Sequence, residues 1–447
     1  MKKIGLISLG CDKNRVDSEI LLGNAVCNKF KVVNNPMDAD VLIINTCAFI
    51  ESARQEAIEA IFDMVNVKNA TGAKIIVTGC LAQRYPQQLF EEIPEIDAVV
   101  GASFYSNFAT MCVKVLSGER FVEVNGQLKG IEHGSRLLTT PSDYAYLRIA
   151  DGCDNFCTYC SIPFIRGRYR SRAKEELKKE AVSLVENGVK EIILVAQDVT
   201  NYGVDIYGKL EIVDLIRILS QIDALQSIRL LYCYPERITD RLIAEIANNP
   251  KVVKYIDIPL QHVDDDVLKR MNRKSTYNQI VDVIQKLRNN VKNIALRTTF
   301  ICGFPAETQQ AHDKVKEFLK TYKFTNVGFF AYSKEEGTAA FSMPQQIDDA
   351  KKAEWVQDLA ETQNKISREF NKKLLGQPLN VIIDGFLGVQ DDGKNLYESR
   401  AYFMAPQIDG KVYLTTTKNL KVGQNVDVLV TDYNDYDLMG VLSDESA

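Results

Sequence analysis

Residues 148–160 of this chain are Arg148-Ile149-Ala150-Asp151-Gly152-Cys153-Asp154-Asn155-Phe156-Cys157-Thr158-Tyr159-Cys160. They follow an apolar run, Tyr144 to Ile149, that predicts a β-strand. The three thiols stand at the spacing Cys-x3-Cys-x2-Cys, which folds them around one corner, as a soft-metal site requires. The alternative is three neighbouring core cysteines, but a polar loop that contains glycine is poor core material. We therefore predict a metal site at Cys153, Cys157 and Cys160.

The number of ligands distinguishes between metals. Zinc would need a fourth ligand nearby, and the three histidines of the chain, His133, His262 and His312, are distant in sequence. Three thiolates on a four-iron cluster instead leave one iron open to bind a small molecule. The spacing therefore favours a [4Fe-4S] cluster with one open iron.

The cysteine triplet resembles the signature of the radical S-adenosylmethionine (radical SAM) enzymes. The resemblance implies that the open iron chelates the amino and carboxylate groups of S-adenosylmethionine. It also implies that Tyr159, directly before the third cysteine, contacts the adenine of that cofactor.

Length and composition restrict the number of domains and the classes of protein to which the chain can belong. A chain of 447 residues is expected to form two to three domains, and 46% hydrophobic with 25% charged residues is ordinary for a globular protein. The net charge of −5, taken over the whole chain, does not indicate nucleic-acid binding. No apolar run approaches membrane-spanning length, and the start of the chain is expected to be a strand rather than a secretory signal. With ten cysteines and no export signal, we expect a cytoplasmic protein whose thiols bind metals or react rather than pair.

Residues 1–118 are predicted to form an open α/β sheet domain, because apolar strand-like segments alternate with helical ones. Three such segments, Lys3 to Leu9, Val41 to Ile44 and Lys74 to Val77, are followed within a few residues by Cys11, Cys47 and Cys80. The strand ends of such a sheet line one crevice, so the three thiols are expected to converge there. The alternative is three separate structural thiols, but three cysteines at equivalent places favour a second metal site.

A cysteine-bearing α/β domain ahead of a radical SAM core resembles the methylthiotransferases, which modify either a tRNA adenosine or an aspartate of a ribosomal protein. The stretch from Ser8 to Glu19 is similar to the ribosomal-protein branch, RimO. The tRNA branch usually has Gln-Met-Asn after the first cysteine, whereas this chain has Asp12-Lys13-Asn14. The resemblance implies a protein substrate and a second [4Fe-4S] cluster on Cys11, Cys47 and Cys80.

Residues 139–370 contain five further strand-like segments between helical stretches: Glu191 to Ala196, Ile228 to Tyr232, Tyr255 to Pro259, Ile294 to Phe300 and Val327 to Tyr332. With the strand before Cys153 they make six βα units, which resemble the partial (βα)6 barrel of radical SAM enzymes. By resemblance, Gln197 and Gln261 are candidates to hold polar groups of S-adenosylmethionine, and Arg297 to hold its carboxylate or ribose; ordinary hydrogen bonding within the barrel is the alternative. The basic run Arg166 to Arg172 is predicted to hold an anionic group, or else to be a solvated loop.

Residues 373–440 are predicted to form a small antiparallel β-barrel similar to the TRAM module of the methylthiotransferases, after a long helix from Asp348 to Leu375. From residue 376 onward the chain has five Lys and Arg against eleven Asp and Glu, a net charge of −6. Such a charge repels a phosphate backbone and attracts a basic ribosomal protein. Acidic and aromatic residues concentrate between Asp432 and Asp437. We hypothesise that this barrel binds a basic protein, which disfavours tRNA as a partner.

The resemblance implies a radical reaction that uses two [4Fe-4S] clusters and S-adenosylmethionine. Cleavage of S-adenosylmethionine at Cys153, Cys157 and Cys160 would give a 5′-deoxyadenosyl radical. This radical would take hydrogen from the β-carbon of an aspartate in the small-subunit ribosomal protein of the decoding centre (the twelfth small-subunit protein), and the second cysteine set would deliver a sulfur methylated by a second S-adenosylmethionine. An electron donor such as a flavodoxin or ferredoxin would be a further partner. The alternatives are a tRNA adenosine methylthiotransferase and, more distantly, a non-enzymatic iron–sulfur electron carrier.

Overall fold

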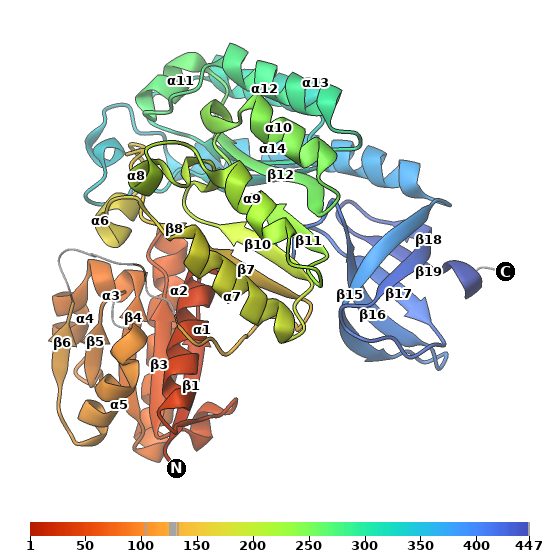
Figure 1. Ribbon diagram of the computed structural model, residues 1–447. Coiled ribbons are helices and arrows are strands. Elements are labelled where there is room, and N and C mark those ends of the chain that lie inside the picture. The colour runs from red at the N-terminus through yellow and green to blue at the C-terminus, as the bar shows by residue number, and fades with distance from the viewer. Residues whose placement is uncertain (103–104, 125–130, 132–133, 446–447) are drawn as a thin grey trace.

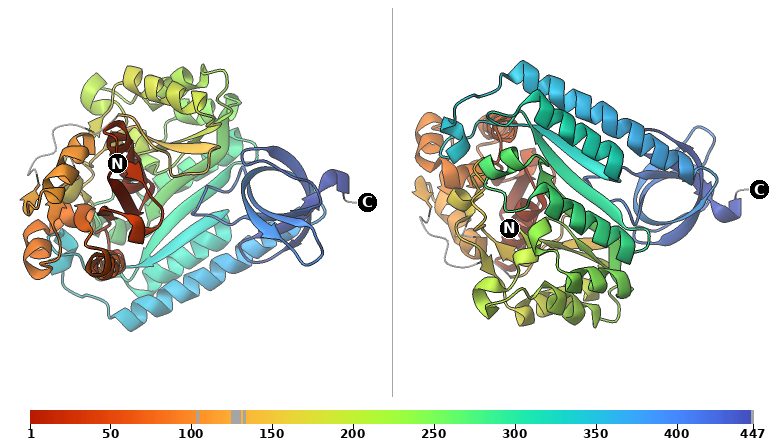
Figure 2. Two further views of the ribbon diagram at one scale, coloured as in Figure 1. Left: turned by 90° about the horizontal axis from the view of Figure 1, so that it is seen from below. Right: turned by 90° about the horizontal axis from the view of Figure 1, so that it is seen from above.

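The computed structural model describes residues 1–102, 105–124, 131 and 134–445. An N-terminal α/β sheet and a small C-terminal barrel flank a central partial barrel (Figures 1 and 2). The predicted fold class is therefore confirmed. Among the helices of the described residues, none is both long enough and apolar enough to cross a membrane.

The N-terminal body is a six-stranded parallel sheet in the order β2-β1-β3-β4-β5-β6. Its strands are β1 (Lys3–Ser8), β2 (Lys31–Val32), β3 (Val41–Thr46), β4 (Lys74–Gly79), β5 (Ala98–Val100) and β6 (Phe121–Glu123). Its helices are α1 (Asp12–Cys27), α2 (Glu51–Thr71), α3 (Cys80–Arg84), α4 (Pro86–Glu92) and α5 (Phe108–Leu116). Every residue of β3 is buried, which explains its nearly continuous apolar sequence. The sheet extends past residue 118, since β6 pairs with β5.

The central body is a six-stranded parallel sheet in the order β14-β13-β12-β11-β10-β7, curved into a partial barrel with helices on its outer face (Figure 1). Its strands are β7 (Tyr144–Arg148), β10 (Glu191–Val195), β11 (Ser227–Leu230), β12 (Val252–Gln261), β13 (Ala295–Cys302) and β14 (Asn326–Ala331). Its helices are α6 (Ile162–Arg166), α7 (Lys174–Glu186), α8 (Val204–Tyr207), α9 (Ile212–Ser220), α10 (Asp240–Asn248), α11 (Asp265–Arg270), α12 (Tyr277–Asn290), α13 (Gln309–Tyr322) and α14 (Asp349–Leu374). A short antiparallel pair, β8 (Ala150–Asp151) and β9 (Arg170–Ser171), follows β7.

The C-terminal body is a closed barrel in the order β15-β16-β17-β19-β18, and Figure 2 shows it nearly end-on as a ring that α14 reaches from the central body. Its strands are β15 (Pro378–Val389), β16 (Asn395–Ala401), β17 (Val412–Thr416), β18 (Asn425–Tyr433) and β19 (Leu438–Leu442). One pair departs from the predicted antiparallel pattern, because β17 and β19 run parallel. The reason is parity: five strands in a closed ring cannot all alternate in direction.

Buried ion pairs attach the C-terminal barrel to the amino-terminal ends of the central strands. Arg400 of β16 lies 3.1 Å from Asp143 and 2.7 Å from Glu191, the first residue of β10. Glu191 also receives a 2.7 Å bond from Arg229 of β11. The C-terminal barrel therefore covers one end of the central barrel and leaves the carboxyl ends of the strands to the N-terminal domain.

Candidate functional site

The first cysteine set lies in the loop that follows β7 and β8. Cys153 and Cys157 are buried and Cys160 is partly exposed. Hydrogen bonds tie the loop to the segments after α6 and β10, since the amide of Cys153 donates to the carbonyl of Gly167 and the side chain of Asn155 donates to Asp198. The loop also holds Phe156 at a φ of 48°, a left-handed conformation that its surroundings must impose.

The three thiols of this set lie close enough to interact. Burial raises the pKa of Cys153 to about 12, and the neighbouring Cys157 adds to the rise. Burial and the other two thiols raise the pKa of Cys160 as well. Adjacent buried thiolates need a positive partner, and a metal cluster that displaces their protons provides it. The residues therefore fit an iron–sulfur cluster.

The second cysteine set converges where the N-terminal strands end, although Cys11, Cys47 and Cys80 are far apart in sequence. Cys11 stands directly before α1 and is exposed, whereas Cys47 follows β3, Cys80 begins α3, and both are buried. Burial raises the pKa of Cys47 to about 12, and Cys80 and Cys11 add to the rise. The predicted convergence is thus observed, and these thiols also fit a cluster.

Neither set forms a site for a single ion. Among the described residues, no three or more His, Cys, Asp or Glu side chains surround a point that one metal ion could occupy. A four-iron cluster needs a wider arrangement, because each thiolate ligates a different iron.

A buried charged network joins the two sets through Arg166. Helix α6 begins two residues after Cys160, packs against α3, and ends at Arg166. The guanidinium of Arg166 lies 3.4 Å from the Sγ of Cys80 and 2.7 Å from Asp17 of α1. Arg148, the last residue of β7, also pairs with Asp17. The first cysteine loop and the second cysteine set are therefore held by one continuous set of contacts.

The basic run Arg166 to Arg172 differs from both predicted alternatives. Arg166 and Arg172 are buried and pair with protein carboxylates, Arg166 with Asp17 and Arg172 with Glu180 at 2.7 Å. Arg168, by contrast, has a side chain that is 72% exposed. Arg166 and Arg172 therefore find their anions inside the protein, and Arg166 connects the central barrel to the N-terminal domain.

Asn14 holds together the loops of the second cysteine set. Its Nδ2 donates to the carbonyls of Leu9 and Thr46, at 3.1 and 2.8 Å. Its Oδ1 accepts a 2.6 Å bond from Arg166. Asn14 and Arg166 were singled out in the sequence only as parts of longer motifs, and their roles depend on contacts between distant segments.

Three of the four candidate cofactor-binding residues lie near the first cysteine set or at the carboxyl ends of barrel strands. Tyr159 packs edge-on against Phe304, with ring centroids 6.5 Å apart, and burial raises the pKa of its hydroxyl well above the ordinary value. Gln197 donates to Asp151 at 3.0 Å and leaves its buried Oε1 without a partner. Gln261 ends β12 at a φ of 70°. An unpaired oxygen and a left-handed glutamine at strand ends suit ligand binding.

Arg297, the fourth candidate, lies elsewhere than predicted. It is the third residue of β13 and points its guanidinium at Asp257, at 2.9 Å, and at Asp409 of the C-terminal barrel, at 3.2 Å. The hydroxyl of Tyr255 also bonds to Asp409 at 2.7 Å. Position within the strand explains the difference, because Arg297 is near the amino end whereas the cysteines are at the carboxyl ends. Its partners assign Arg297 to the seam between barrels.

Two further charged residues lie near the sites: Arg273, which the sequence analysis did not single out, and Lys13, which it named only as part of Asp12-Lys13-Asn14. Arg273, which follows α11, is buried, donates to the carbonyl of Pro259 at 2.7 Å and lies over the ring of Tyr234 at 4.2 Å. Burial lowers the pKa of Lys13, but Asp12 and Tyr232 outweigh burial and raise it. Lys13 therefore remains a cation beside the second cysteine set.

Neither described histidine belongs to these sites. His262 accepts from the amide of Asp264 and lies 3.4 Å from Glu307, while His312 lies 2.9 Å from Asp358. His133 lies outside the described residues. The histidines therefore give no fourth ligand to Cys153, Cys157 and Cys160 within the described chain.

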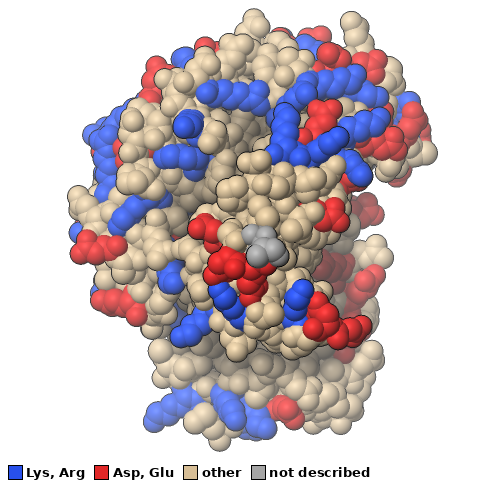
Figure 3. Space-filling view, turned by 90° about the vertical axis from the view of Figure 1, so that its right-hand side faces the viewer, with Lys and Arg blue, Asp and Glu red and all other residues tan. Residues whose placement is uncertain are grey.

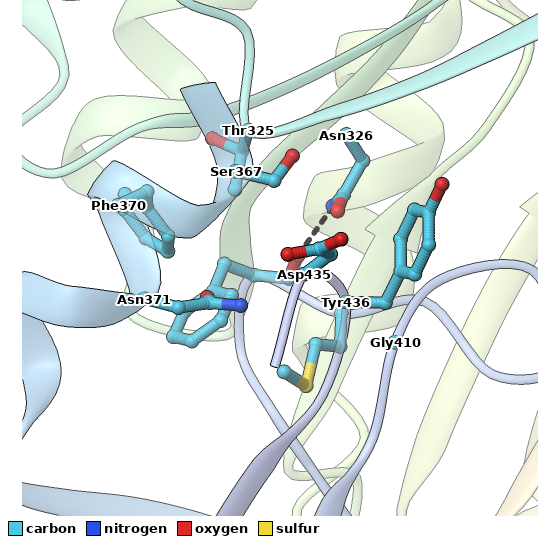
Figure 4. Close-up of a pocket in the computed structure, with 10 residues that line it drawn as sticks. Thr325, Asn326, Ser367, Phe370, Asn371, Gly410, Asp435 and Tyr436 are labelled. Atoms are coloured by element: carbon cyan, nitrogen blue, oxygen red, sulfur yellow. Dashed lines mark hydrogen bonds between the residues drawn. The ribbon is translucent and has the colours of Figure 1, made fainter. Parts of the chain in front are cut away.

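A small cavity marks the seam between the central and C-terminal barrels (Figure 4). Its volume is about 30 Å³, room for little more than a water molecule. Asn326 donates across it to the carbonyl of Phe403 at 2.8 Å. Asp435 and Tyr436 line it and contact α14, with Asp435 3.1 Å from Arg368. Within the segment Asp432 to Asp437, Asp435 and Tyr436 therefore belong to this seam, whereas Asp432 is exposed.

The comparisons with known proteins cover the whole chain. Residues 3–101 match the uncharacterized protein family UPF0004, residues 147–319 the radical SAM superfamily, and residues 375–442 the TRAM domain. The chain is 48% identical over 447 residues to the ribosomal protein uS12 methylthiotransferase RimO of Clostridium botulinum (strain Eklund 17B / Type B), a match that covers 99% of each chain. It is 46% identical over 441 residues to the protein of that name from Thermoanaerobacter sp. (strain X514), covering 98% of this chain and 100% of that one.

Solved structures resemble the chain in fold. The radical S-adenosylmethionine methyltransferase TsrM of Kitasatospora setae, with cobalamin and a [4Fe-4S] cluster bound, has a TM-score of 0.53 and 13% identity, covering 74% of this chain and 75% of that one. The cobalamin-dependent S-adenosylmethionine radical enzyme OxsB has a TM-score of 0.50 and 15% identity, covering 82% of this chain and 56% of that one. Because its sequence is 46–48% identical to these relatives over nearly the full length, the chain belongs to the ribosomal protein uS12 methylthiotransferases, RimO.

Proposed function

We propose that this protein is a radical SAM methylthiotransferase that attaches a methylthio group to the β-carbon of an aspartate in ribosomal protein uS12. One observation carries the proposal: two sets of three cysteines, from two domains, lie on either side of Arg166, which contacts Cys80 and ends the helix that begins after Cys160. A reaction that removes hydrogen and inserts sulfur at one carbon needs two such centres side by side.

Cys153, Cys157 and Cys160 would hold one iron–sulfur cluster, and S-adenosylmethionine would bind beside it. Bound there, these cofactors supply the one-electron chemistry that removes hydrogen from an unactivated C–H bond. The chain orients them: Tyr159 presents an aromatic face, and the unpaired Oε1 of Gln197 with Gln261 presents polar groups. These three residues are the proposed contacts to S-adenosylmethionine.

Cys11, Cys47 and Cys80 would hold a second [4Fe-4S] cluster, which would supply sulfur. Arg166 places a fixed positive charge 3.4 Å from the Sγ of Cys80, and it stabilises thiolate at that position. Burial raises the pKa of Cys80, Cys11 and Asp17 add to the rise, and Arg166 opposes it. The exposed Cys11 would be on the side of the set that substrate approaches.

A protein substrate suits the charge of the C-terminal barrel better than tRNA. Asp391, Asp392, Asp427 and Asp432 are exposed on it. Acidic side chains gather around the centre of the face that carries this barrel, with basic ones above and below them (Figure 3). A ribosomal protein rich in Lys and Arg is attracted to such acids, whereas a phosphate backbone is repelled. We propose a cytoplasmic location, since a substrate in the ribosome is found there.

The reduction step needs an electron donor, which we propose to be a flavodoxin or ferredoxin. Phe156 and Phe164, beside the first cysteine set, are 40% and 69% exposed, and the guanidinium of Arg168 lies 5.1 Å from the Phe156 ring. Exposed aromatic and basic side chains next to a redox site form a suitable contact for a small acidic protein.

The function is tested by an anaerobic assay of the reconstituted protein with S-adenosylmethionine, sulfide and reductant. Purified uS12 and bulk tRNA are offered in parallel, and mass spectrometry measures a methylthio group on each. Modification of the uS12 aspartate supports the proposal. Modification of tRNA alone would keep the chemistry and overturn the substrate.

Two cysteine variants separate the two centres. Cys157→Ala is expected to abolish cleavage of S-adenosylmethionine, because it removes a ligand of the first cluster. Cys47→Ala is expected to spare cleavage, measured as 5′-deoxyadenosine, and to lose methylthiolation of uS12. Equal loss of both activities in the two variants would contradict the assigned roles.

A further inference from the structure

Lys13 is a buried cation at the contact between the N-terminal sheet and the central barrel. Only 8% of the residue is exposed. Its ammonium lies 3.0 Å from Oδ1 of Asp12 and 3.4 Å from the centroid of the Tyr232 ring. Lys13 stands two residues after Cys11, and Tyr232 follows strand β11. One side chain thus links the exposed thiol of the second cysteine set to a strand end of the barrel.

Tyr232, the partner ring, is held in a costly conformation. Its φ is 58°, a left-handed backbone conformation that is sterically unfavourable for a residue with a β-carbon. Its amide donates to Oδ2 of Asp257 at 3.0 Å, and Asp257 is itself paired with Arg297. Backbone strain of this kind persists mainly at functional sites, where the surroundings impose it. The ring is therefore placed under Lys13 by the barrel.

The position of Lys13 does not serve helix stability. It lies in the first turn of α1, where the helix dipole disfavours a cation. An ammonium has three N–H donors. Asp12 pairs with the ammonium and the Tyr232 ring faces it, and among the described residues no second carboxylate forms an ion pair with it. A buried ammonium that faces an aromatic ring and pairs with a single carboxylate is suited to bind a second carboxylate from a ligand.

We propose that Lys13 binds the side-chain carboxylate of the substrate aspartate and so holds its β-carbon beside Cys11. This inference rests on the proposed function. In an aspartate the β-carbon is bonded directly to the carboxyl carbon, so a contact to the carboxylate fixes the reacting carbon without covering it. In the absence of substrate, the carboxylate of Asp12 forms the ion pair with the ammonium of Lys13. An adenosine base carries no such charge, so Lys13 also selects protein over tRNA.

Binding of uS12 to the protein with both clusters loaded tests the proposal, using uS12 and a form whose target aspartate is replaced by asparagine. The unmodified enzyme is expected to bind the aspartate form about tenfold more tightly, as a hydrogen bond to a charged group provides. Lys13→Met and Lys13→Gln should reduce this preference to about twofold or less. Lys13→Arg, which keeps the cation, should retain it. Lys178→Met, which removes an exposed lysine of α7, controls for net charge.

Full preference for aspartate in either neutral variant would overturn the proposal. Iron content and cleavage of S-adenosylmethionine show whether the variants keep both clusters, and a purely structural lysine would lower affinity for both uS12 forms equally. Failure of the unmodified enzyme to methylthiolate uS12 would instead refute the proposed function.

Discussion

Gly10 is the residue that lets the loop of Cys11 approach Cys47. Its φ is +85°, and a β-carbon built there would stand 2.8 Å from the β-carbon of Cys47 and 3.0 Å from its sulfur. Only glycine accepts both the conformation and the contact. Assembly of the second cysteine set thus requires a residue without a β-carbon at position 10.

Gly10→Ala is therefore expected to impair the second cluster selectively. The added methyl group displaces Cys47, so the reconstituted protein should contain about half the iron and lose methylthiolation while it still cleaves S-adenosylmethionine. Iron analysis and 5′-deoxyadenosine formation measure the two effects. Gly72→Ala is the matched control, because Gly72 has a φ of +77° but nothing within 4 Å of the added carbon. Full iron content in Gly10→Ala would contradict this account.

At the scale of elements, α1, β7 and α6 are joined by Asp17. This carboxylate is fully buried on α1 and pairs with Arg148 at the end of β7 and with Arg166 at the end of α6. These three elements carry or adjoin both cysteine sets. The relative position of the two sets is thus decided by charges in the interior and not by the chain connection between the domains.

Asp17→Asn is expected to lower the free energy of unfolding by about 3–5 kcal/mol, because it leaves two guanidinium groups buried without their shared carboxylate. Urea unfolding at neutral pH measures the change. Glu317→Gln, which breaks an exposed pair with Lys320 on α13, should cost at most about 1 kcal/mol. A loss from Asp17→Asn as small as that of the control would show that the network does not hold the domains.

At the scale of the whole molecule, the C-terminal barrel is attached through Glu191. Burial would raise the pKa of this carboxyl, but Arg229 and Arg400 outweigh burial and lower it to about 2, from an ordinary value of 4.5. A carboxyl with a lowered pKa contributes stability that is present above its unfolded pKa and lost as pH falls through its folded pKa.

The attachment is therefore expected to be constant from neutral pH to about pH 5 and to weaken below it, with a total loss of about 3 kcal/mol. Glu191→Gln should be less stable at neutral pH and should lack this part of the pH dependence. The urea midpoint of both proteins, measured from neutral pH down to about pH 3, checks the expectation. Identical slopes would mean that other carboxylates, such as Asp143 beside Arg400, govern acid sensitivity.

Substrate choice also belongs to the whole molecule, because it depends on where the surface acids lie. Reversing Asp391 and Asp392 to lysine is expected to lower kcat/KM for uS12 on the order of tenfold at low salt and to flatten its salt dependence. Glu91→Lys with Glu119→Lys on the N-terminal domain makes the same change in net charge away from the barrel. Unchanged turnover and salt dependence after the barrel reversal would refute a role of these acids in binding.

Local patterns in the sequence predicted much of this protein. Periodicity predicted all six strands of the central sheet and β1, β3 and β4 of the N-terminal sheet, but not the short strands β2, β5 and β6. The short spacing of Cys153, Cys157 and Cys160 predicted one metal site, since it depends on neighbours along the chain. Convergence of Cys11, Cys47 and Cys80 was predictable too, because parallel strands end at one edge of a sheet.

Only the tertiary structure decided what joins these parts. Arg166 and Asn14 act on cysteines of other segments, Arg297 bonds to the C-terminal barrel, and Lys13 lies over a ring more than two hundred residues away. The parallel pair β17 and β19 follows from closing a ring of five strands. Charged side chains in the sequence do not reveal their partners, because a buried ion pair is chosen by the packing of whole domains and not by spacing along the chain.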